Sequence, residues 1–403
     1  MKLPGNSKFL KRLNRFQVFD TIRNAGVISK AEIKNITKLT PTTISEITSS
    51  MLNEGLILNA GVAESTGGRP SQLVTLNPDY GYFIGIDIDV GIIRTVLLSF
   101  DMKVLSSFEI NTPAFSPFEF IEHVIEIYNN FVNNFNLSKD MIKGIGISIP
   151  GLISKDEKIE LAPNLNWNEV DIKESLFSIF RNTIAIENES RLSAIAEKHV
   201  GLAKNINNFM AINIKSGVGS GIYINSQLYK GTSGNAGELG HITVKEDGPL
   251  CGCGNFGCLE TMVSTPSIIK RMIMYMKQGE SSILFERFDI NEISLENIVN
   301  CANDGDELCL RVLQSASKYT AIGISSVINL INPRMIILGG DIILFKDILL
   351  SKVNDIVEKK ALKSNRASCE IKVTELGKFS SAIGAAIHSI NRFMGYEYSI
   401  NAL

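Results

Sequence analysis

The chain has 403 residues, of which 44% are hydrophobic and 20% are charged, and its formal net charge is −2. This length is enough for two or three domains with sizeable cores, and the composition excludes a disordered or fibrous protein. No apolar run approaches the roughly 20 residues of a membrane span and no secretory signal is recognisable, so we expect a cytoplasmic protein without membrane contact.

Positive charge is concentrated at the amino-terminal end. Residues 1–40 contain nine lysines and arginines against only Asp20 and Glu32, so the rest of the chain carries the compensating negative charge. Such a basic end favours contact with a polyanion there, and the alternative is a solvated basic face.

Helices are predicted in the first 53 residues. Apolar residues at helical spacing indicate a first helix over 10–25. Ser29 can cap a second helix over 30–37, and Thr40 can cap a third that runs to about Asn53. A turn of two to four residues joins the last two helices, which is typical of a helix-turn-helix.

The outward face of the third helix carries short polar side chains suited to base edges and phosphates in a major groove. The predicted DNA contacts on and before this helix are Thr40, Thr42, Thr43, Ser45 and Glu46. Short strands over 56–58 and 72–76 surround a Gly-Gly-Arg-Pro loop and predict a β wing, whose Arg69 would enter a minor groove. A small helical docking domain is the alternative to DNA binding.

After residue 82 the pattern changes to alternating strands and helices. In the first half, strands are predicted over 83–89, 92–100, 103–110, 142–149 and 183–186, with a helix over 117–134 and a polar loop after residue 151. A second half repeats the plan, with strands over 208–214, 222–224, 335–338 and 370–375 and helices over 266–278, 292–304, 306–330, 346–361 and 380–393.

These elements predict an α/β protein in which a winged helix-turn-helix precedes a duplicated actin-like domain. We place the winged helix-turn-helix at residues 1–77. The first actin-like subdomain would comprise residues 78–193 with the C-terminal helix 378–403. The second would comprise 194–377 and carry a metal loop and an oligomerisation surface.

The metal loop is the most specific local pattern in the chain. Three thiols within eight residues follow an imidazole by a short spacer, which suits a closed tetrahedral structural Zn²⁺ site. The predicted ligands are His241, Cys251, Cys253 and Cys258. Buried or redox-active cysteines are the alternative. Two carboxylates, Glu238 and Glu260, flank the ligands, so a metal in the loop would also orient them.

The chain resembles the ROK family, which groups repressors, uncharacterised reading frames and sugar kinases. It is most similar to the repressor branch that contains xylose and N-acetylglucosamine repressors. The motifs that carry the resemblance are Glu238-Leu-Gly-His241, Cys251-Gly-Cys253-Gly-x-x-Gly-Cys258-x-Glu260, Thr66-Gly-Gly-Arg-Pro70 and Pro150-Gly151. The resemblance covers nearly the whole chain and implies an actin-like fold with structural zinc.

The resemblance also implies a sugar site. Carried over residue by residue, the groups that hold sugar hydroxyls are Asn188, Glu189, Glu238, His241 and Glu260. The chemistry agrees, because a pyranose is a ring of hydroxyls that donate and accept hydrogen bonds to carboxylates, amides and imidazoles. Trp167, the only tryptophan, would either stack on the sugar or pack in the core, and we favour the core.

Kinases of this family have a Gly-Gly-Thr hairpin that approaches the ATP phosphates, where this chain has Asp89-Val90-Gly91-Ile92. Their catalytic base is an aspartate, at the position where this chain has the longer Glu189. A carboxylate in the phosphate site and a base displaced by about 1 Å both disfavour phosphoryl transfer. The glycine turn 217–221 is retained, so an ATP-dependent sugar kinase with a DNA-binding extension remains the alternative.

We therefore predict a non-enzymatic transcriptional repressor of carbohydrate-utilisation genes, with no catalytic residue. Its partners would be an inverted-repeat operator in double-stranded DNA and a monosaccharide effector, either xylose, glucose or an N-acetylhexosamine. We expect a homodimer or homotetramer, because two-fold symmetry in the protein would match that of the operator. A third possibility is a DNA-binding protein whose pocket serves a protein partner.

Overall fold

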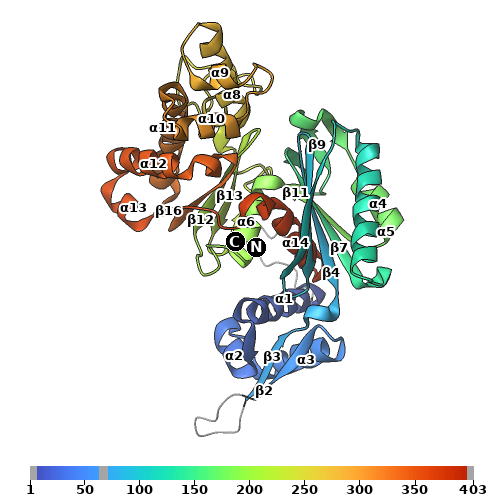
Figure 1. Cartoon of the computed structure of the whole chain (residues 1–403). Helices are drawn as coiled ribbons and strands as arrows, with labels where there is room; N and C mark the ends of the chain where they lie inside the picture. The colour runs from blue at the N-terminus through green and yellow to red at the C-terminus, as the bar shows by residue number, and fades with distance from the viewer. Residues whose placement is uncertain (1–6, 63–70, 397–403) are drawn as a thin grey trace.

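The computed structural model describes residues 7–62 and 71–396. We call residues 7–76 the head (Figure 1). Its described elements are α1 (Ser7–Ala25), β1 (Val27–Ser29), α2 (Lys30–Thr37), α3 (Pro41–Asn53), β2 (Ile57–Val62) and β3 (Gln72–Leu76). The strands form an antiparallel sheet in the order β1-β3-β2. The predicted bounds of α2 and α3 are confirmed, whereas β1 was not predicted, because three residues are too few to show an alternating pattern.

Local capping explains the two short helices of the head. Ser29 and Glu32 form a reciprocal capping box at the start of α2. The Thr40 hydroxyl accepts the backbone N–H of Thr43 at the start of α3. Between them, Lys38 adopts a left-handed conformation with φ of 60°, which ends α2 and turns the chain into α3.

The first lobe contains the sheet β11-β7-β4-β5-β6. Its strands are β4 (Tyr82–Asp89), β5 (Ile92–Ser99), β6 (Val104–Asn111), β7 (Ile142–Ile149) and β11 (Thr183–Asn188). The strands β4, β5 and β6 are antiparallel, and β7 runs parallel to both β4 and β11. The helices α4 (Pro117–Asn134) and α5 (Lys173–Phe180) lie on the outer face in Figure 1.

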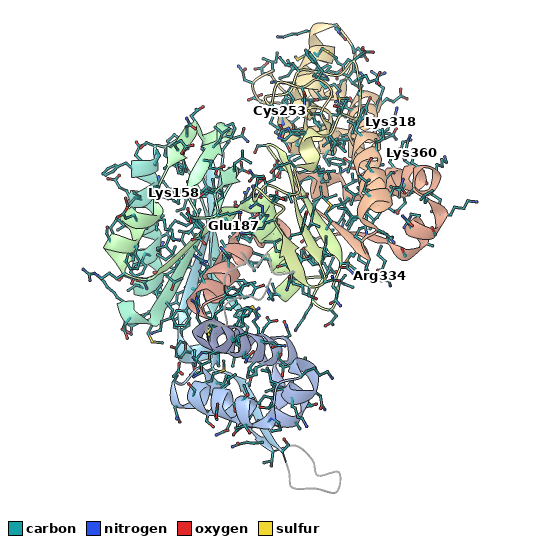
Figure 2. All side chains as sticks on the ribbon, turned by 180° about the vertical axis from the view of Figure 1, so that it is seen from behind. Lys158, Glu187, Cys253, Lys318, Arg334 and Lys360 are labelled. Atoms are coloured by element: carbon teal, nitrogen blue, oxygen red, sulfur yellow. The ribbon has the colours of Figure 1, made fainter. Side chains whose placement is uncertain are left out.

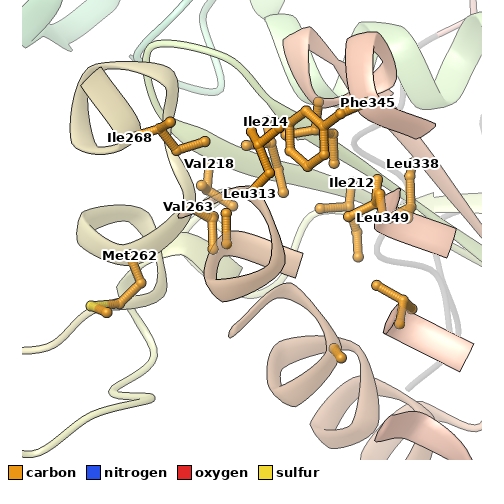
Figure 3. Close-up of a cluster of buried hydrophobic side chains, with 14 of the residues drawn as sticks. Ile212, Ile214, Val218, Met262, Val263, Ile268, Leu313, Leu338, Phe345 and Leu349 are labelled. Carbon is orange, nitrogen blue, oxygen red and sulfur yellow. The ribbon is translucent and has the colours of Figure 1, made fainter. Parts of the chain in front are cut away.

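The second lobe repeats this topology in the sheet β14-β13-β12-β15-β16. Its strands are β12 (Phe209–Ile214), β13 (Val218–Ile224), β14 (Gln227–Tyr229), β15 (Met335–Gly340) and β16 (Glu370–Val373). The α-helices of this lobe are α7 (Leu259–Val263), α8 (Thr265–Lys277), α9 (Ile283–Arg287), α10 (Leu295–Asn303), α11 (Glu307–Ile331), α12 (Lys346–Lys360) and α13 (Lys363–Ser368). Figure 3 shows the core where Ile212, Ile214 and Val218 meet side chains of these helices. In each lobe the central strand, β4 or β12, is followed by two antiparallel strands on one side. On its other side it pairs with one parallel strand, which pairs in turn with a second, so the predicted duplication is confirmed.

Two helices lie between the lobes, α6 (Glu189–His199) and α14 (Ser380–Phe393) (Figure 1). α14 packs on β4 and β7, α6 packs on β12 and β13, and the two helices pack on each other. Their close approach depends on Gly384, where a Cβ would lie 1.8 Å from the carbonyl oxygen of Leu192. α6 was not predicted because its sequence is rich in polar residues, whereas every one of its side chains is buried in the structure.

The polar loop expected after residue 151 is partly ordered into a small sheet. Its strands are β8 (Leu152–Ile153), β9 (Ile159–Ala162) and β10 (Trp167–Val170). Trp167 is 2% exposed and its indole N–H donates to the carbonyl of Phe115, so its predicted place in the core is confirmed.

The head packs against the lobes through the C-terminal half of α1. Arg23 donates to the side-chain oxygen of Asn391 on α14 (2.6 Å) and lies 3.4 Å from the ring Nε2 of His199, the last residue of α6. Near it, the Phe16 ring stacks on Tyr396 with the centroids 4.1 Å apart. The apolar core of the head is therefore continuous with the core around α6 and α14. Within the described ranges, no helix is long and apolar enough to cross a membrane.

Candidate functional site

The four predicted metal ligands come together on the second lobe, where Figure 2 marks Cys253. The short helical turn η4 (Leu239–His241) places His241 with its Nδ1 3.6 Å from the Cys251 sulfur. The sulfurs of Cys253 and Cys258 are 3.7 Å apart, and all four ligand atoms lie within 4.8 Å of one another. A tetrahedral Zn²⁺ with sulfur ligands at about 2.3 Å separates those ligands by about 3.8 Å, so the donor set fits this ion.

The backbone of the metal loop follows a tight path that requires glycine at one position. The Cys251 N–H donates to the carbonyl of Asn255 (2.7 Å), which closes a tight turn around Cys253. Gly257 has φ of 66°, and a Cβ there would lie 1.6 Å from the carbonyl oxygen of Lys245. Only glycine fits this crossing, because any side chain would collide with backbone.

The two flanking carboxylates lie beside the ligands. Glu238 Oε2 is 4.0 Å from His241 Nε2, so this ring presents Nδ1 to the cysteines and Nε2 to the carboxylate. Glu260 Oε2 accepts the N–H of Val218 (3.0 Å), and its other oxygen is 4.0 Å from the Cys251 sulfur. Burial raises the pKa of Glu238 above its ordinary value. The metal loop thus holds Glu260 against the start of β13.

A second charged cluster lies where the two lobes meet. Lys215, in the turn between β12 and β13, has a side chain that is only 5% exposed. Its ammonium is 3.2 Å from Asp87 of β4 and 3.3 Å from Glu189, the first residue of α6. Next to it, the Ser216 hydroxyl donates to Asp89 (3.2 Å). One turn of the second lobe therefore binds two carboxylates of the first lobe.

Neighbouring groups complete the cluster. The Ser148 hydroxyl donates to Asp87 (2.5 Å), and the Arg94 guanidinium lies 3.8 Å and 3.9 Å from Asp87 and Asp89. Burial raises the pKa of Glu189 to about 7, and Asp89 and Asp87 add to the rise while Lys215 opposes it. Burial disfavours a charge on Lys215, but the surrounding carboxylates outweigh this effect and raise its pKa.

Asn188 caps α6. Its side-chain oxygen accepts the N–H groups of Ser190 (3.0 Å) and Arg191 (3.3 Å), and its amide donates to the carbonyl of Gly151 (3.0 Å). Arg191 in turn donates to Glu187 (2.8 Å), which lies near the middle of the molecule in Figure 2. These bonds fix the start of α6 and so the position of Glu189.

The turn over residues 215–218 contacts predicted sugar ligands in two places, at the start of α6 and beside the metal loop. Lys215 pairs with Glu189, while the backbone of Val218 pairs with Glu260. Between them, a Cβ on Gly217 would lie 2.9 Å from Glu260 Oε2. The structure thus places Glu238, His241 and Glu260 together, and it links them to Glu189 through this turn.

Sequence reasoning missed Lys215 and Asp87. Two signals were present: a lysine directly before the Ser-Gly-Val-Gly turn, and an aspartate within the otherwise apolar run Phe83-Ile-Gly-Ile-Asp87-Ile.

Two cavities of about 480 and 600 Å³ elsewhere share Asn182 and Thr183 in their walls, and no predicted site residue lines either.

The predicted DNA contacts lie on and before α3. Thr40, Thr42, Ser45 and Glu46 are exposed, and Thr43 is half-buried. The hydroxyls of Thr40 and Thr43 lie 2.9 Å apart and take part in the helix cap. The predicted wing tip with Arg69 lies outside the described residues.

The repeated sheet topology of the two lobes defines the class of the protein as a duplicated, actin-like α/β protein. The sequence profile of the ROK family matches residues 83–391, and the chain belongs to this family. The predicted family and the predicted actin-like α/β fold are both confirmed, while the winged helix-turn-helix of the head stays a prediction.

Similarity to known regulators extends over almost the whole chain. The chain is 31% identical to the xylose repressor of Bacillus subtilis over 390 residues, which cover 97% of this chain and 98% of that protein. It is 29% identical to the DNA-binding transcriptional dual regulator NagC of Escherichia coli, over 94% of this chain and 93% of that one. The crystal structure of a ROK family transcriptional regulator, a homologue of the E. coli Mlc protein, superposes with a TM-score of 0.83 at 28% identity, covering 96% of this chain and 97% of that one.

A kinase shares the fold over a shorter part of the chain. The ROK glucokinase of Streptomyces griseus, solved with glucose and AMPPNP, matches with a TM-score of 0.67 at 22% identity. The match covers 98% of the kinase but 76% of this chain, and at this identity it supports the fold alone.

Proposed function

We propose that this protein is a sugar-responsive transcriptional repressor of carbohydrate-utilisation genes. The observation that carries the proposal is the extent of its similarity. The xylose repressor matches 97% of the chain, whereas a kinase matched over nearly its whole length covers 76%. The head, with its short helices and its sheet, is the kind of extension that an operator-binding protein needs.

DNA would be bound by the head. Three residues separate α2 from α3, which is a short helix-turn-helix connection. With α3 in a major groove, the exposed Thr42, Ser45 and Glu46 would reach base edges, while Thr40 and Thr43 lie at the helix start, where phosphates bind well. Arg69 would add a minor-groove contact. Two heads on an inverted repeat require a homodimer or homotetramer.

The sugar would be bound between the metal loop and the start of α6. Glu238, Glu260 and Glu189 would accept hydrogen bonds from hydroxyls, and His241 would use the ring nitrogen that faces away from the cysteines. Asn188 is already engaged in capping, but its amide carries a second hydrogen for a sugar oxygen. A zinc ion held by His241 and the three cysteines would supply no chemistry and would only fix the loop.

We further propose that the protein does not phosphorylate the sugar. Asp89 stands on the hairpin where phosphates would have to approach, and its negative charge would repel them. Glu189, the residue in the place of a catalytic base, is held by the Lys215 ammonium 3.3 Å away. A coupled assay with ATP and each candidate sugar tests this point, and robust sugar-dependent turnover would overturn it.

The repressor proposal is tested by fluorescence anisotropy. The DNA is a duplex selected with the full chain from a random library, and the sugars are xylose, glucose and N-acetylglucosamine. One of these should change operator affinity by roughly 5- to 150-fold, the usual range of allosteric coupling. Thr42→Ala should weaken specific binding, while Ser364→Ala, on α13 of the second lobe, should not. Failure to select any sequence would refute DNA recognition, and unchanged affinity with every sugar would refute the effector.

A further inference from the structure

A buried ammonium connects the two lobes and a predicted sugar ligand. Lys215 reaches Asp87 on the first sheet and Glu189 on α6, at 3.2 Å and 3.3 Å. Its side chain is 5% exposed and that of Glu189 is 9% exposed, so water screens this pair poorly. The lysine belongs neither to the metal loop nor to the set of residues that the family resemblance assigns to the sugar.

The charge balance around Glu189 explains why a cation is needed there. Asp87 and Asp89 of β4 lie beside it, and only Lys215 bonds to it directly among the described groups. Arg94 of β5 is 3.8 to 3.9 Å from the two aspartates, and Asp341, which follows β15, interacts with the same charges. Without Lys215, four carboxylates would share this largely buried region with one arginine, and Glu189 would take up a proton.

The protonation state of Glu189 decides what it can bind. An ionised carboxylate accepts hydrogen bonds from hydroxyl groups at both oxygens, whereas a protonated one also donates and loses most of its strength as an acceptor. A neutral sugar offers hydroxyl donors. The negative surroundings also make this a site for an uncharged ligand rather than for one that carries a phosphate or carboxylate.

We propose that Lys215 is a positioning residue of the sugar site. Its ammonium keeps Glu189 ionised, so that this carboxylate accepts a hydrogen bond from a hydroxyl of a neutral monosaccharide. The same ammonium bonds to Asp87, so Lys215 of the second lobe connects Glu189 of α6 to the sheet of the first lobe. This inference rests on the proposed function, because it assumes that Glu189 contacts a sugar. It goes further by assigning a residue that contacts no sugar itself and by restricting the ligand to uncharged sugars.

The test uses isothermal titration of the full-length protein with xylose, glucose and N-acetylglucosamine at about pH 6, 7 and 8. In the wild type, affinity should rise several-fold over this range, because the pKa of Glu189 is about 7. Lys215→Met should bind at least tenfold more weakly near neutral pH, and its affinity should increase only at a higher pH than in the wild type. Asp87→Asn removes a negative neighbour while leaving the Lys215 bond to Glu189, so its affinity should increase at a lower pH than in the wild type.

The two opposite displacements separate positioning from a merely structural role. A matched control is Lys173→Met, which removes another partly buried lysine paired with a glutamate, Glu157, and should leave affinity and pH profile unchanged. If Lys215→Met does not fold, Asp87→Asn still tests the idea, and an unmoved profile in that variant overturns it. Wild-type-like affinity and profile in a folded Lys215→Met variant also overturn it. If the wild type binds none of the sugars, the proposed function itself fails, which is a distinct result.

Discussion

The junction between the head and the lobes should depend strongly on Arg23. Its side chain is 1% exposed, and it donates to Asn391 over 2.6 Å. Its guanidinium carbon also lies 5.8 Å and 5.1 Å from the ring centroids of Phe16 and Phe19. Arg23→Met keeps much of the apolar length and removes the charge and all of these polar contacts.

The expected loss follows from these contacts. A buried hydrogen bond from a charged donor contributes roughly 1.5 to 3 kcal/mol, and a cation–π contact about 1 kcal/mol. The ion pair with Asp20, whose side chain is 35% exposed, adds less than about 1 kcal/mol. The substitution also removes the free-energy cost of burying the charged guanidinium, and this gain offsets part of the loss. We therefore expect a destabilisation of about 3 kcal/mol for the contact between α1 and the lobes.

Hydrogen exchange with mass spectrometry measures this directly. A loss of about 3 kcal/mol should raise the exchange rates of α1 amides by about 100-fold, since 1.4 kcal/mol corresponds to a factor of ten. The control is Arg334→Met, which removes an arginine that is 56% exposed and paired with Glu370, and it should leave α1 unchanged. Exchange of α1 in Arg23→Met within threefold of the wild type would refute the reasoning.

Other predictions concern the metal loop and the buried charges. Cys253→Ser should lower zinc, measured by elemental analysis, from about one ion per chain to a small fraction, while Cys301→Ser, outside the cluster, should retain it. Equal metal in both variants would contradict the ligand assignment. Gly257→Ala should also lose zinc, because its Cβ would lie 1.6 Å from a backbone oxygen, whereas Gly252→Ala, with nothing within 4 Å, should not. Burial opposes the charge of Glu157, but neighbouring cations hold its pKa near 2. Its ionised form therefore contributes about 3 kcal/mol to the free energy of unfolding. This contribution is present above the ordinary pKa of 4.5 and is lost as the pH falls toward 2. Urea denaturation should therefore find Glu157→Gln less stable than wild type near neutral pH and nearly equal to it at about pH 2, and a pH-independent difference would argue against this pairing.

The sequence alone determined the features that depend on neighbouring residues. Helix caps at Ser29 and Thr40 fixed the bounds of α2 and α3, because a cap satisfies backbone groups only three residues away. The cluster of four candidate metal ligands could also be predicted, because three of its members lie within one short, glycine-containing loop, and the structure brings all four together. The doubled order of strands and helices was sufficient to predict the two actin-like lobes.

Tertiary structure alone decided how the charges between the lobes are paired. Lys215 and Asp87 are 128 residues apart, and no local pattern indicates that a lysine after one buried strand will meet an aspartate within another. The same reason concealed α6, in which all polar residues are buried and Glu189 and Glu197 bond to Lys215 and Thr374 from distant segments. Coulombic pairing in a buried region depends on distance in space, so it appears only once the two sheets and the helices between them are assembled.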